Sequence, residues 1–478
     1  MTAPTGGSAE PSRERIEQQA RAVCSPAAIE AALAAGASAD AVAVEDILQR
    51  AMQREGLPLG EVAVLLQVTD PALRGRIREA ARRVHDRLFG RRIGPSVPIC
   101  PTNRCAQDCL YCPLRRSNTR LRRFAATPRD MQRQIAAVLD EGHRHVNLVF
   151  GDDRSGVQYV RDMVWAAYGV RSGMAQIQRV DLNLDPPRVV DLRELRDAPL
   201  GTFHMFQETY HPAAYAALHP DGLKADYAWR LTGPDRAHEA GLPDVGLGVL
   251  LGAGDWRFDV PALLMHAAYL TAAYGRGPHT ISYPRMVPAP GAPASQEPER
   301  QVSDEDFTFL VAVTRLAAPE VGIILSTPVV TEVRRELYSL GVSQVSVGST
   351  TYPGVYTDDG DPTSAGALTI GRPRALEDLV YRMCDVGFVP NFCGVCFVQR
   401  RHEALVDQAP APARAPERCA PNALLALNEY LLDYASSETK TVAGRLIQGE
   451  LARLPAEVRQ MTLELMAEAE AGLRGQML

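Results

Sequence analysis

Short apolar, β-branched runs alternate with longer stretches of helical periodicity along the chain from Pro95 onward. Runs of this length predict buried strands, and the stretches between them predict amphipathic helices. The predicted strands are Val97 to Cys100, His145 to Phe150, Arg179 to Leu184, Thr202 to Gln207, Val245 to Leu251, Thr280 to Tyr283, Gly322 to Ser326 and Gln344 to Val347. About eight strands, each followed by a helix, are typical of an α/β fold of the (βα)8 TIM-type barrel class.

The predicted helices each carry one apolar face. They are Asp130 to Leu139, Tyr159 to Tyr168, Asp226 to Ala240, Ala262 to Tyr274, Asp304 to Leu316, Thr331 to Leu340 and Leu376 to Val386. A doubly wound open sheet is the alternative fold for such a pattern. The glycine-rich turn that should follow its first strand is absent, so the barrel is the favoured fold.

Both flanks of the barrel are predicted to be helical. We expect residues 1–14 to form a disordered tail, 15–90 an N-terminal helical extension, 91–388 the barrel, and 389–478 a C-terminal region with further cysteines and helices. A Gly-, Asp- and Pro-rich stretch from Thr351 to Pro373 predicts a long loop after the last strand. The stretch from Leu446 to Leu473 predicts an amphipathic helical tail.

Composition excludes several classes of protein. The chain has 478 residues, of which 46% are hydrophobic and 23% are charged, as in ordinary globular proteins. Its net charge of -6 and dispersed arginines give no reason to expect nucleic-acid binding. We find no signal-peptide core and no apolar run of about eighteen residues, so we expect a cytoplasmic protein with no membrane partner. Cytoplasmic thiols are reduced, which favours metal ligation over disulfides.

Three cysteines lie within eight residues, directly after the first predicted strand: Cys105, Cys109 and Cys112. Thiolates suit iron-sulfur clusters, and a cubane cluster needs four ligands. Three ligands would leave one iron open, as catalytic metal sites keep a position open for a reactant. Since barrel active sites lie at the C-terminal ends of the strands, we expect this set at the active mouth. A zinc site closed by a distant histidine is the alternative.

A second set of three cysteines occurs near the C-terminal end of the sequence. Cys393 and Cys396 are followed after 22 residues by Cys419. A helix is predicted to start at Pro421, which would place its amide dipoles beside a bound anionic cluster. The alternative is again zinc, with His402 as the fourth ligand.

The spacing of Cys105, Cys109 and Cys112, with Tyr111 before the last cysteine, resembles the radical S-adenosylmethionine (SAM) enzymes. Further segments resemble the aromatic amino-acid lyase branch of that family: Phe206 to His211, Leu218 to Pro220, Asp226 to Arg230, Gly277 to Ser282 and Gly341 to Ser349. Within this branch, the second cysteine set is similar only to the [FeFe]-hydrogenase maturase type, HydG.

The resemblance implies an activity. A 4Fe-4S cluster would split SAM to a 5′-deoxyadenosyl radical, and the Cα-Cβ bond of tyrosine would then break to give p-cresol and dehydroglycine. At a second 4Fe-4S cluster, which carries an additional iron in this type, dehydroglycine would become carbon monoxide and cyanide. Expected partners are an electron donor such as ferredoxin or flavodoxin and a hydrogenase-maturation scaffold protein.

The resemblance also implies roles for individual residues. The metal ligands would be Cys105, Cys109 and Cys112 for the first cluster, Cys393, Cys396 and Cys419 for the second, and His279 for the additional iron. The SAM-binding residues would be Tyr111, Gly151, Asp152, Glu208 and Arg230, and the substrate-binding residues Ser282 and Ser349. A structural ion pair is the alternative role for Glu208 and Arg230, and a core position is the alternative for His279.

Two arginines expected from the family pattern are replaced, by Pro328 and by Thr350. Arginines at a barrel mouth suit bidentate binding of a carboxylate, so the substrate pocket differs from the usual one. Two alternatives to the tyrosine lyase therefore stay open. One is a HydG-like paralogue that acts on a different amino acid or in a different metal-cofactor pathway. The other is a non-catalytic, zinc-stabilised barrel.

Overall fold

A computed structural model describes residues 10–152, 156–296, 300–326, 329–357, 367–370, 376–398 and 416–478. Most of the predicted N-terminal tail lies outside these ranges. Helix α1 (Arg13–Val23) begins inside the predicted tail, because the Ser12 side chain accepts a hydrogen bond from the backbone N-H of Arg15 and caps it. None of the described helices combines the length and the hydrophobicity that a membrane-spanning segment needs.

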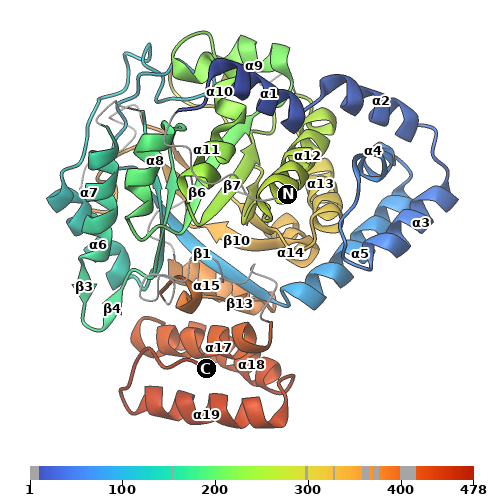
Figure 1. Cartoon of the computed structure of the whole chain (residues 1–478). Helices are drawn as coiled ribbons and strands as arrows, with labels where there is room; N and C mark the ends of the chain where they lie inside the picture. The colour runs from blue at the N-terminus through green and yellow to red at the C-terminus, as the bar shows by residue number, and fades with distance from the viewer. Residues whose placement is uncertain are drawn as a thin grey trace.

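Eight parallel strands form a closed barrel (Figure 1). They are β1 (Arg92–Ile99), β2 (His145–Val149), β5 (Arg179–Asn183), β6 (Thr202–Glu208), β7 (Asp244–Val249), β8 (Thr280–Ser282), β9 (Gly322–Leu325) and β10 (Val342–Ser346). The barrel closes where β10 pairs in parallel with β1, with Gly94 opposite Gln344. The barrel prediction is confirmed. Among the strands, the largest boundary error is the start of β1 at Arg92 instead of Val97, because Gly94 and Pro95 interrupt the strand signal.

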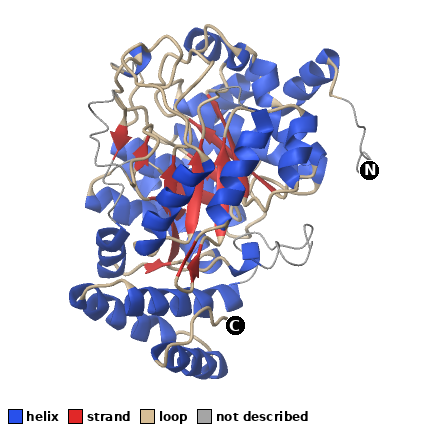
Figure 2. Ribbon diagram, turned by 90° about the vertical axis from the view of Figure 1, so that its left-hand side faces the viewer, coloured by secondary structure: helices blue, strands red, loops and turns tan. Residues whose placement is uncertain are grey.

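Helices surround this barrel, as Figure 2 shows for the whole chain. They are α6 (Pro128–Asp140), α7 (Gly156–Tyr168), α8 (Val189–Arg196), α9 (Pro212–Leu218), α10 (Tyr227–Leu231), α11 (Gly233–Ala240), α12 (Trp256–Tyr274), α13 (Asp304–Ala317), α14 (Thr331–Leu340) and α15 (Leu376–Asp385), with the 3-10 turns η1 (Leu223–Ala225) and η2 (Pro293–Ser295). The helix predicted from Asp226 to Ala240 is divided at Thr232, because Gly233 and Pro234 favour a new helix start. The short helices α8 and α9 were not predicted.

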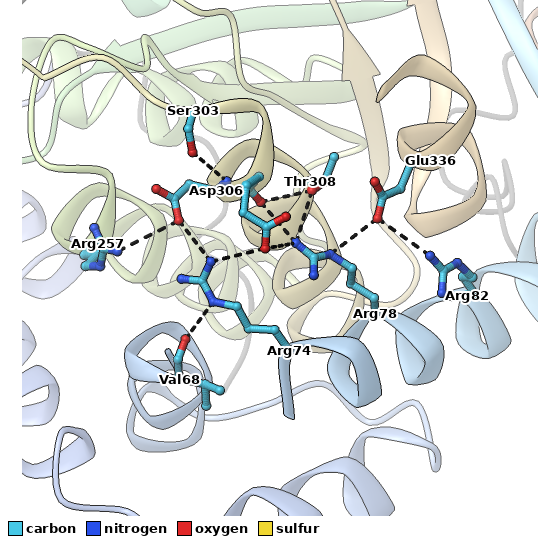
Figure 3. A network of polar contacts seen from close by, with 10 residues as sticks. Val68, Arg74, Arg78, Arg82, Arg257, Ser303, Asp306, Thr308 and Glu336 are labelled. Carbon is cyan, nitrogen blue, oxygen red and sulfur yellow. Dashed lines mark hydrogen bonds and ion pairs between the residues drawn. The ribbon is translucent and has the colours of Figure 1, made fainter. Parts of the chain in front are cut away.

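Four more helices extend the N-terminal side: α2 (Pro26–Gly36), α3 (Ala41–Ala51), α4 (Leu59–Gln67) and α5 (Pro71–Leu88). Helix α5 docks on α13 and α14 through the ionic network in Figure 3. Arg74 lies 3.3 Å from Asp306, and Arg78 lies 3.4 Å from Glu336. These contacts fix the extension against the barrel.

The C-terminal helices α17 (Pro416–Asp433), α18 (Ser437–Leu451) and α19 (Ala456–Glu470) form a separate layer below the barrel in Figure 1. Two predictions are wrong here. The expected helical tail is broken at Pro455, which is the N-cap residue of α19. Helix α17 starts at Pro416 instead of Pro421, so Cys419 lies in its first turn.

Short strands complete the structure. They are β3 (Arg171–Ser172), β4 (Ala175–Gln176), β11 (Ser349–Thr350), β12 (Thr369–Ile370) and β13 (Val389–Pro390). The predicted loop from Thr351 to Pro373 therefore contains a strand, β12, which pairs antiparallel with β11. Strand β13 pairs in parallel with Arg92 and Ile93, at the start of β1.

The strands place polar side chains on the barrel axis. Val146 and Leu148 of β2 are fully buried, and the side chains that alternate with them must point to the opposite face of the sheet. Asp181 of β5 is paired with Asn147 of β2 and so lies on that opposite face. Its carboxylate accepts from Nε2 of His145 at 2.8 Å and lies 3.3 Å from Nε2 of His204. Barrels of this class are usually filled by bulky branched residues, so this interior is unusually polar.

Candidate active site

The loop after β1 carries the first cysteine set and is tied at both ends. Asn103 donates from Nδ2 to the carbonyl oxygen of Arg122 at 2.9 Å, and its Oδ1 accepts from the backbone N-H of Phe124 at 2.6 Å. Thr102 forms an isolated bridge with Ala125. These contacts close the loop at the C-terminal end of β1, where the barrel reasoning placed it.

The side chain of Arg123 stabilises this loop by hydrogen bonds to its backbone. Its guanidinium donates to the carbonyl oxygens of Asn103 at 2.6 Å, Leu114 at 2.7 Å, Arg115 at 2.5 Å and Asn118 at 3.3 Å. One side chain thus spans the whole cysteine segment. Sequence reasoning missed Arg123, because it is one of many arginines and its four partners are backbone atoms that no motif records.

The three thiols of the first set lie within electrostatic reach of one another. Cys109 is buried, and Cys105 and Cys112 are half-buried. Burial raises the pKa of Cys105 to about 12, and burial followed by the nearby Cys109 and Cys105 thiolates raises the pKa of Cys112. A bound metal reverses this preference, because a coordinating thiol is deprotonated.

The donor set of the first site suits an iron-sulfur cluster. All three side chains are soft thiols, which such clusters use as ligands. Within the described ranges, no group of three or more His, Cys, Asp or Glu side chains is arranged to hold a single metal ion.

Gly151 and Asp152, at the end of β2, touch the cysteine loop. The carbonyl oxygen of Asp152 accepts from the backbone N-H of Ala106 at 2.6 Å, and its carboxylate accepts from Nε2 of Gln107. A Cβ atom at position 151 would overlap the carbonyl oxygen of Arg104, so only glycine allows this approach. The predicted site for the methionyl amine therefore lies beside the first cysteine set.

Glu208, the last residue of β6, forms a buried ion pair with Lys224. Nζ of Lys224 donates to Oε1 of Glu208 at 2.6 Å, and about a tenth of each side chain is exposed. The same Nζ lies 5.6 Å from the ring centre of Tyr111, whose hydroxyl is 3.0 Å from Nε2 of His219. Sequence reasoning missed Lys224, although a signal existed: it is one of only two lysines in the chain.

Arg230 pairs with Asp185 and not with Glu208. Nη1 of Arg230 lies 2.5 Å from Oδ1 of Asp185, and its Nε donates to the carbonyl oxygen of Phe206 at 2.9 Å. Only 3% of Arg230 is exposed. In this structure Glu208 and Arg230 therefore each form an ion pair, with Lys224 and with Asp185, and not with each other.

A cavity of about 310 Å³ opens beside the cysteine loop. Its charged lining includes Asp152, Asp185, Lys224 and Arg230. Arg188 and Asp191 also line it, which gives three carboxylates and three cations, and this mixed charge suits a ligand that carries both an amine and a carboxylate. This volume lies at the lower end of the range typical of small-molecule sites.

The predicted substrate residues are placed only in part. Ser282 is buried at the C-terminal end of β8. The backbone of Ser349 lies in β11, but its side chain and Pro328 lie outside the described residues. Thr350 is buried, and its hydroxyl lies 3.3 Å from that of Thr369 and accepts from the backbone N-H of Tyr352 at 3.1 Å. This hydroxyl is engaged within the hairpin.

The second cysteine set lies at the opposite end of the barrel. Cys393 follows β13, which pairs with the start of β1, whereas the first set follows the end of β1. Burial raises the pKa of Cys393 to about 11, and the Cys396 and Cys419 thiolates add to the effect, so these thiols also lie close together. His402, the alternative ligand, lies outside the described residues.

His279 lies at the same end as the second set. It directly precedes β8, and its ring centre is 6.0 Å from that of Phe397, the residue after Cys396. Its Nδ1 lies 3.7 Å from the Asp244 carboxylate. His279 therefore lies near the second cysteine set, at the end of β8 that faces away from the first set.

Comparison with known proteins identifies the family. Residues 99–262 match the radical SAM superfamily, and residues 282–389 match the Biotin and Thiamin Synthesis associated domain. The 2-iminoacetate synthase of Escherichia coli K12 is 32% identical over 317 residues, which cover 65% of this chain and 81% of that protein. The chain belongs to the radical SAM superfamily. It is a radical SAM enzyme of the carbon-carbon lyase class, and this family uses a 4Fe-4S cluster and SAM.

Solved structures of HydG are similar over more of the chain. A HydG described as a maturase of the [FeFe]-hydrogenase superposes with a TM-score of 0.86 at 32% identity, covering 95% of this chain and 99% of that one. HydG from Carboxydothermus hydrogenoformans gives a TM-score of 0.76 at 30% identity, covering 88% and 93%. The radical SAM enzyme described above thus shares the HydG architecture.

Proposed function

We propose that this radical SAM enzyme is a HydG-type lyase that cleaves the Cα-Cβ bond of tyrosine to p-cresol and dehydroglycine. Carbon monoxide and cyanide for hydrogenase assembly would then form from dehydroglycine. The observation that carries this proposal is the presence of two cysteine sets at opposite ends of one barrel. A HydG structure superposes on 95% of this chain with a TM-score of 0.86, which supports the HydG type.

The chain's own residues would hold and orient the reactants. Cys105, Cys109 and Cys112 would hold the first 4Fe-4S cluster, which together with SAM supplies an electron and a hydrogen-abstracting radical. Cys393, Cys396 and Cys419 would hold the second cluster, and His279 the additional iron. The Asp152 carboxylate would accept from the methionyl amine, while Lys224 and Arg230 present positive charge to the same cavity.

The polar barrel interior supports a division of labour between the two ends. Asp181 of β5 and His204 of β6 are both buried, and Nε2 of His204 lies 3.3 Å from the Asp181 carboxylate. A small polar fragment such as dehydroglycine would find hydrogen-bond partners there, which an apolar core would deny it. The partners expected from the family, a ferredoxin or flavodoxin and a maturation scaffold, belong to the same proposal.

A second candidate keeps the radical chemistry but replaces tyrosine by a different amino acid. The observation that favours it is Thr350, whose hydroxyl is engaged with Thr369 and Tyr352 and carries no charge for a substrate carboxylate. Loss of one charged hydrogen-bonded contact ordinarily costs roughly 1.5 to 3 kcal/mol.

Anaerobic incubation of the reconstituted enzyme with SAM, dithionite and tyrosine separates the two candidates. The tyrosine lyase predicts p-cresol and cyanide alongside 5′-deoxyadenosine. Deoxyadenosine without p-cresol would contradict the tyrosine assignment and favour the second candidate. No deoxyadenosine at all would contradict both.

A further inference from the structure

We propose that Asp259 of α12 is a positioning residue that fixes the backbone turn carrying Glu208, and through it the Glu208-Lys224 pair. The inference rests on the proposed function, in which Lys224 of this pair lines the SAM site. Asp259 does not line the cavity itself. It lies behind the strand end, where a buried carboxylate has no obvious catalytic use.

The backbone at Glu208 is strained. Its φ is +70°, and Arg54 is the only other non-glycine residue with positive φ among the described residues. The register between β6 and β7 also shifts between Phe206 and Glu208. An L-residue persists in this conformation only where its surroundings impose it. Contacts from neighbouring residues must therefore stabilise the backbone turn after Glu208.

Asp259 supplies that hold. Its Oδ1 accepts from the hydroxyl of Thr209 at 2.9 Å and from the backbone N-H of Tyr210 at 2.7 Å, in the two residues that follow Glu208. Asp259 is 2% exposed, and a Cβ atom on Gly254 would collide with its carboxylate. Burial raises the pKa of Asp259 to about 7, because the ionised carboxylate is disfavoured in this buried position.

The same turn also contacts the helix that carries Arg230. The hydroxyl of Tyr227, on α10, donates to the carbonyl oxygen of Tyr210 at 2.7 Å. Arg230 lies one turn along that helix and donates to the carbonyl oxygen of Phe206, two residues before Glu208. Asp259 thus orders a turn that adjoins both ion pairs of the candidate SAM site.

Asp235 of α11 offers a matched control. It is also a fully buried acid with a raised pKa, and it accepts from the hydroxyls of Tyr269 at 2.7 Å and Tyr274 at 2.9 Å. These partners lie on α12, and none of them belongs to a strand end or to the cavity. Loss of Asp235 should therefore lower the stability of the fold without changing the KM for SAM.

The test compares D259A, D259N and D235A in the reconstituted full-length enzyme, by SAM KM for deoxyadenosine formation and by melting temperature. We expect D259A to raise the KM for SAM by roughly tenfold, because a mispositioned contact loses binding energy. D259N keeps one acceptor oxygen and should recover part of this loss. D235A should lower the melting temperature and leave the KM within about twofold.

A double variant tests whether Asp259 acts through Glu208. If it does, adding D259A to E208Q should raise the KM by less than about twofold beyond E208Q alone, because coupled residues are not additive. An equal KM effect of D259A in both backgrounds, or an unchanged KM in D259A, would overturn the inference. So would an unchanged KM in E208Q.

The wild-type enzyme separates this inference from the proposed function. If it forms no deoxyadenosine, the proposed function is overturned, and this inference with it, before any variant is compared. If it forms deoxyadenosine without p-cresol, only the tyrosine assignment is overturned. The Asp259 comparison then still decides, because its readout needs no tyrosine.

Discussion

Replacing Arg123 by lysine should open the loop that carries the first cysteine set. The guanidinium donates four hydrogen bonds to backbone carbonyls from two nitrogen atoms. A lysine ammonium has one nitrogen and cannot reach both groups of acceptors. If two of the four bonds are lost at roughly 1.5 to 3 kcal/mol each, closure of the loop weakens by about 3 to 6 kcal/mol. That corresponds to more than a hundredfold in the closure equilibrium.

The assay is iron content after anaerobic reconstitution, in a C393A/C396A background so that iron reports the first set alone. R123K should retain much less iron than its parent and form little deoxyadenosine. Arg382→Lys is the control, because Arg382 is half exposed and pairs with Asp378 on its own helix. If R123K keeps the parent's iron content and SAM KM, the clamp assigned to Arg123 is refuted.

Three further predictions follow from the same structure. Gly151→Ala should displace the cysteine loop and lower iron content, whereas Gly75→Ala, where nothing lies within 4 Å, should not. Replacing both Cys393 and Cys396 by alanine should spare deoxyadenosine formation but abolish cyanide release, and loss of deoxyadenosine would contradict the division between the two ends. Burial raises the pKa of Asp235 to about 6, so the folded enzyme keeps a proton that the unfolded chain releases, and stability falls as pH rises from about 4 to 6 by roughly 3 kcal/mol. The amide in D235N does not titrate, so the stability of this variant should not fall in this way. Melting curves should therefore show the melting temperature of D235N rising relative to that of wild type between about pH 4 and 6, with a constant difference above pH 6.

The barrel could be predicted because each strand carries its own local signal. The start of β1 could not, since Gly94 and Pro95 break the local pattern and only pairing with β10 and β13 stabilises the strand there. The helix predicted from Asp226 failed at Gly233 for a local reason, the proline that follows it.

The cysteine sets could be predicted because their members are close in sequence and chemically distinctive. Arg123, Lys224 and Asp259 could not, because their partners are backbone atoms or lie in other elements, and only the fold brings them together. The family resemblance placed Glu208 and Arg230 near the site but not with their partners. Lys224 and Asp185 are the residues that complete those pairs.

Iron analysis with electron paramagnetic resonance of the reduced enzyme, before and after addition of SAM, tests the central claim most directly. Two cysteine sets that each hold a cubane cluster predict about eight irons or more per chain. They also predict two cluster signals, of which SAM changes only the one that survives in a C393A/C396A variant. About four irons per chain, zinc in place of iron, or a SAM response lost with Cys393 and Cys396 would contradict the account.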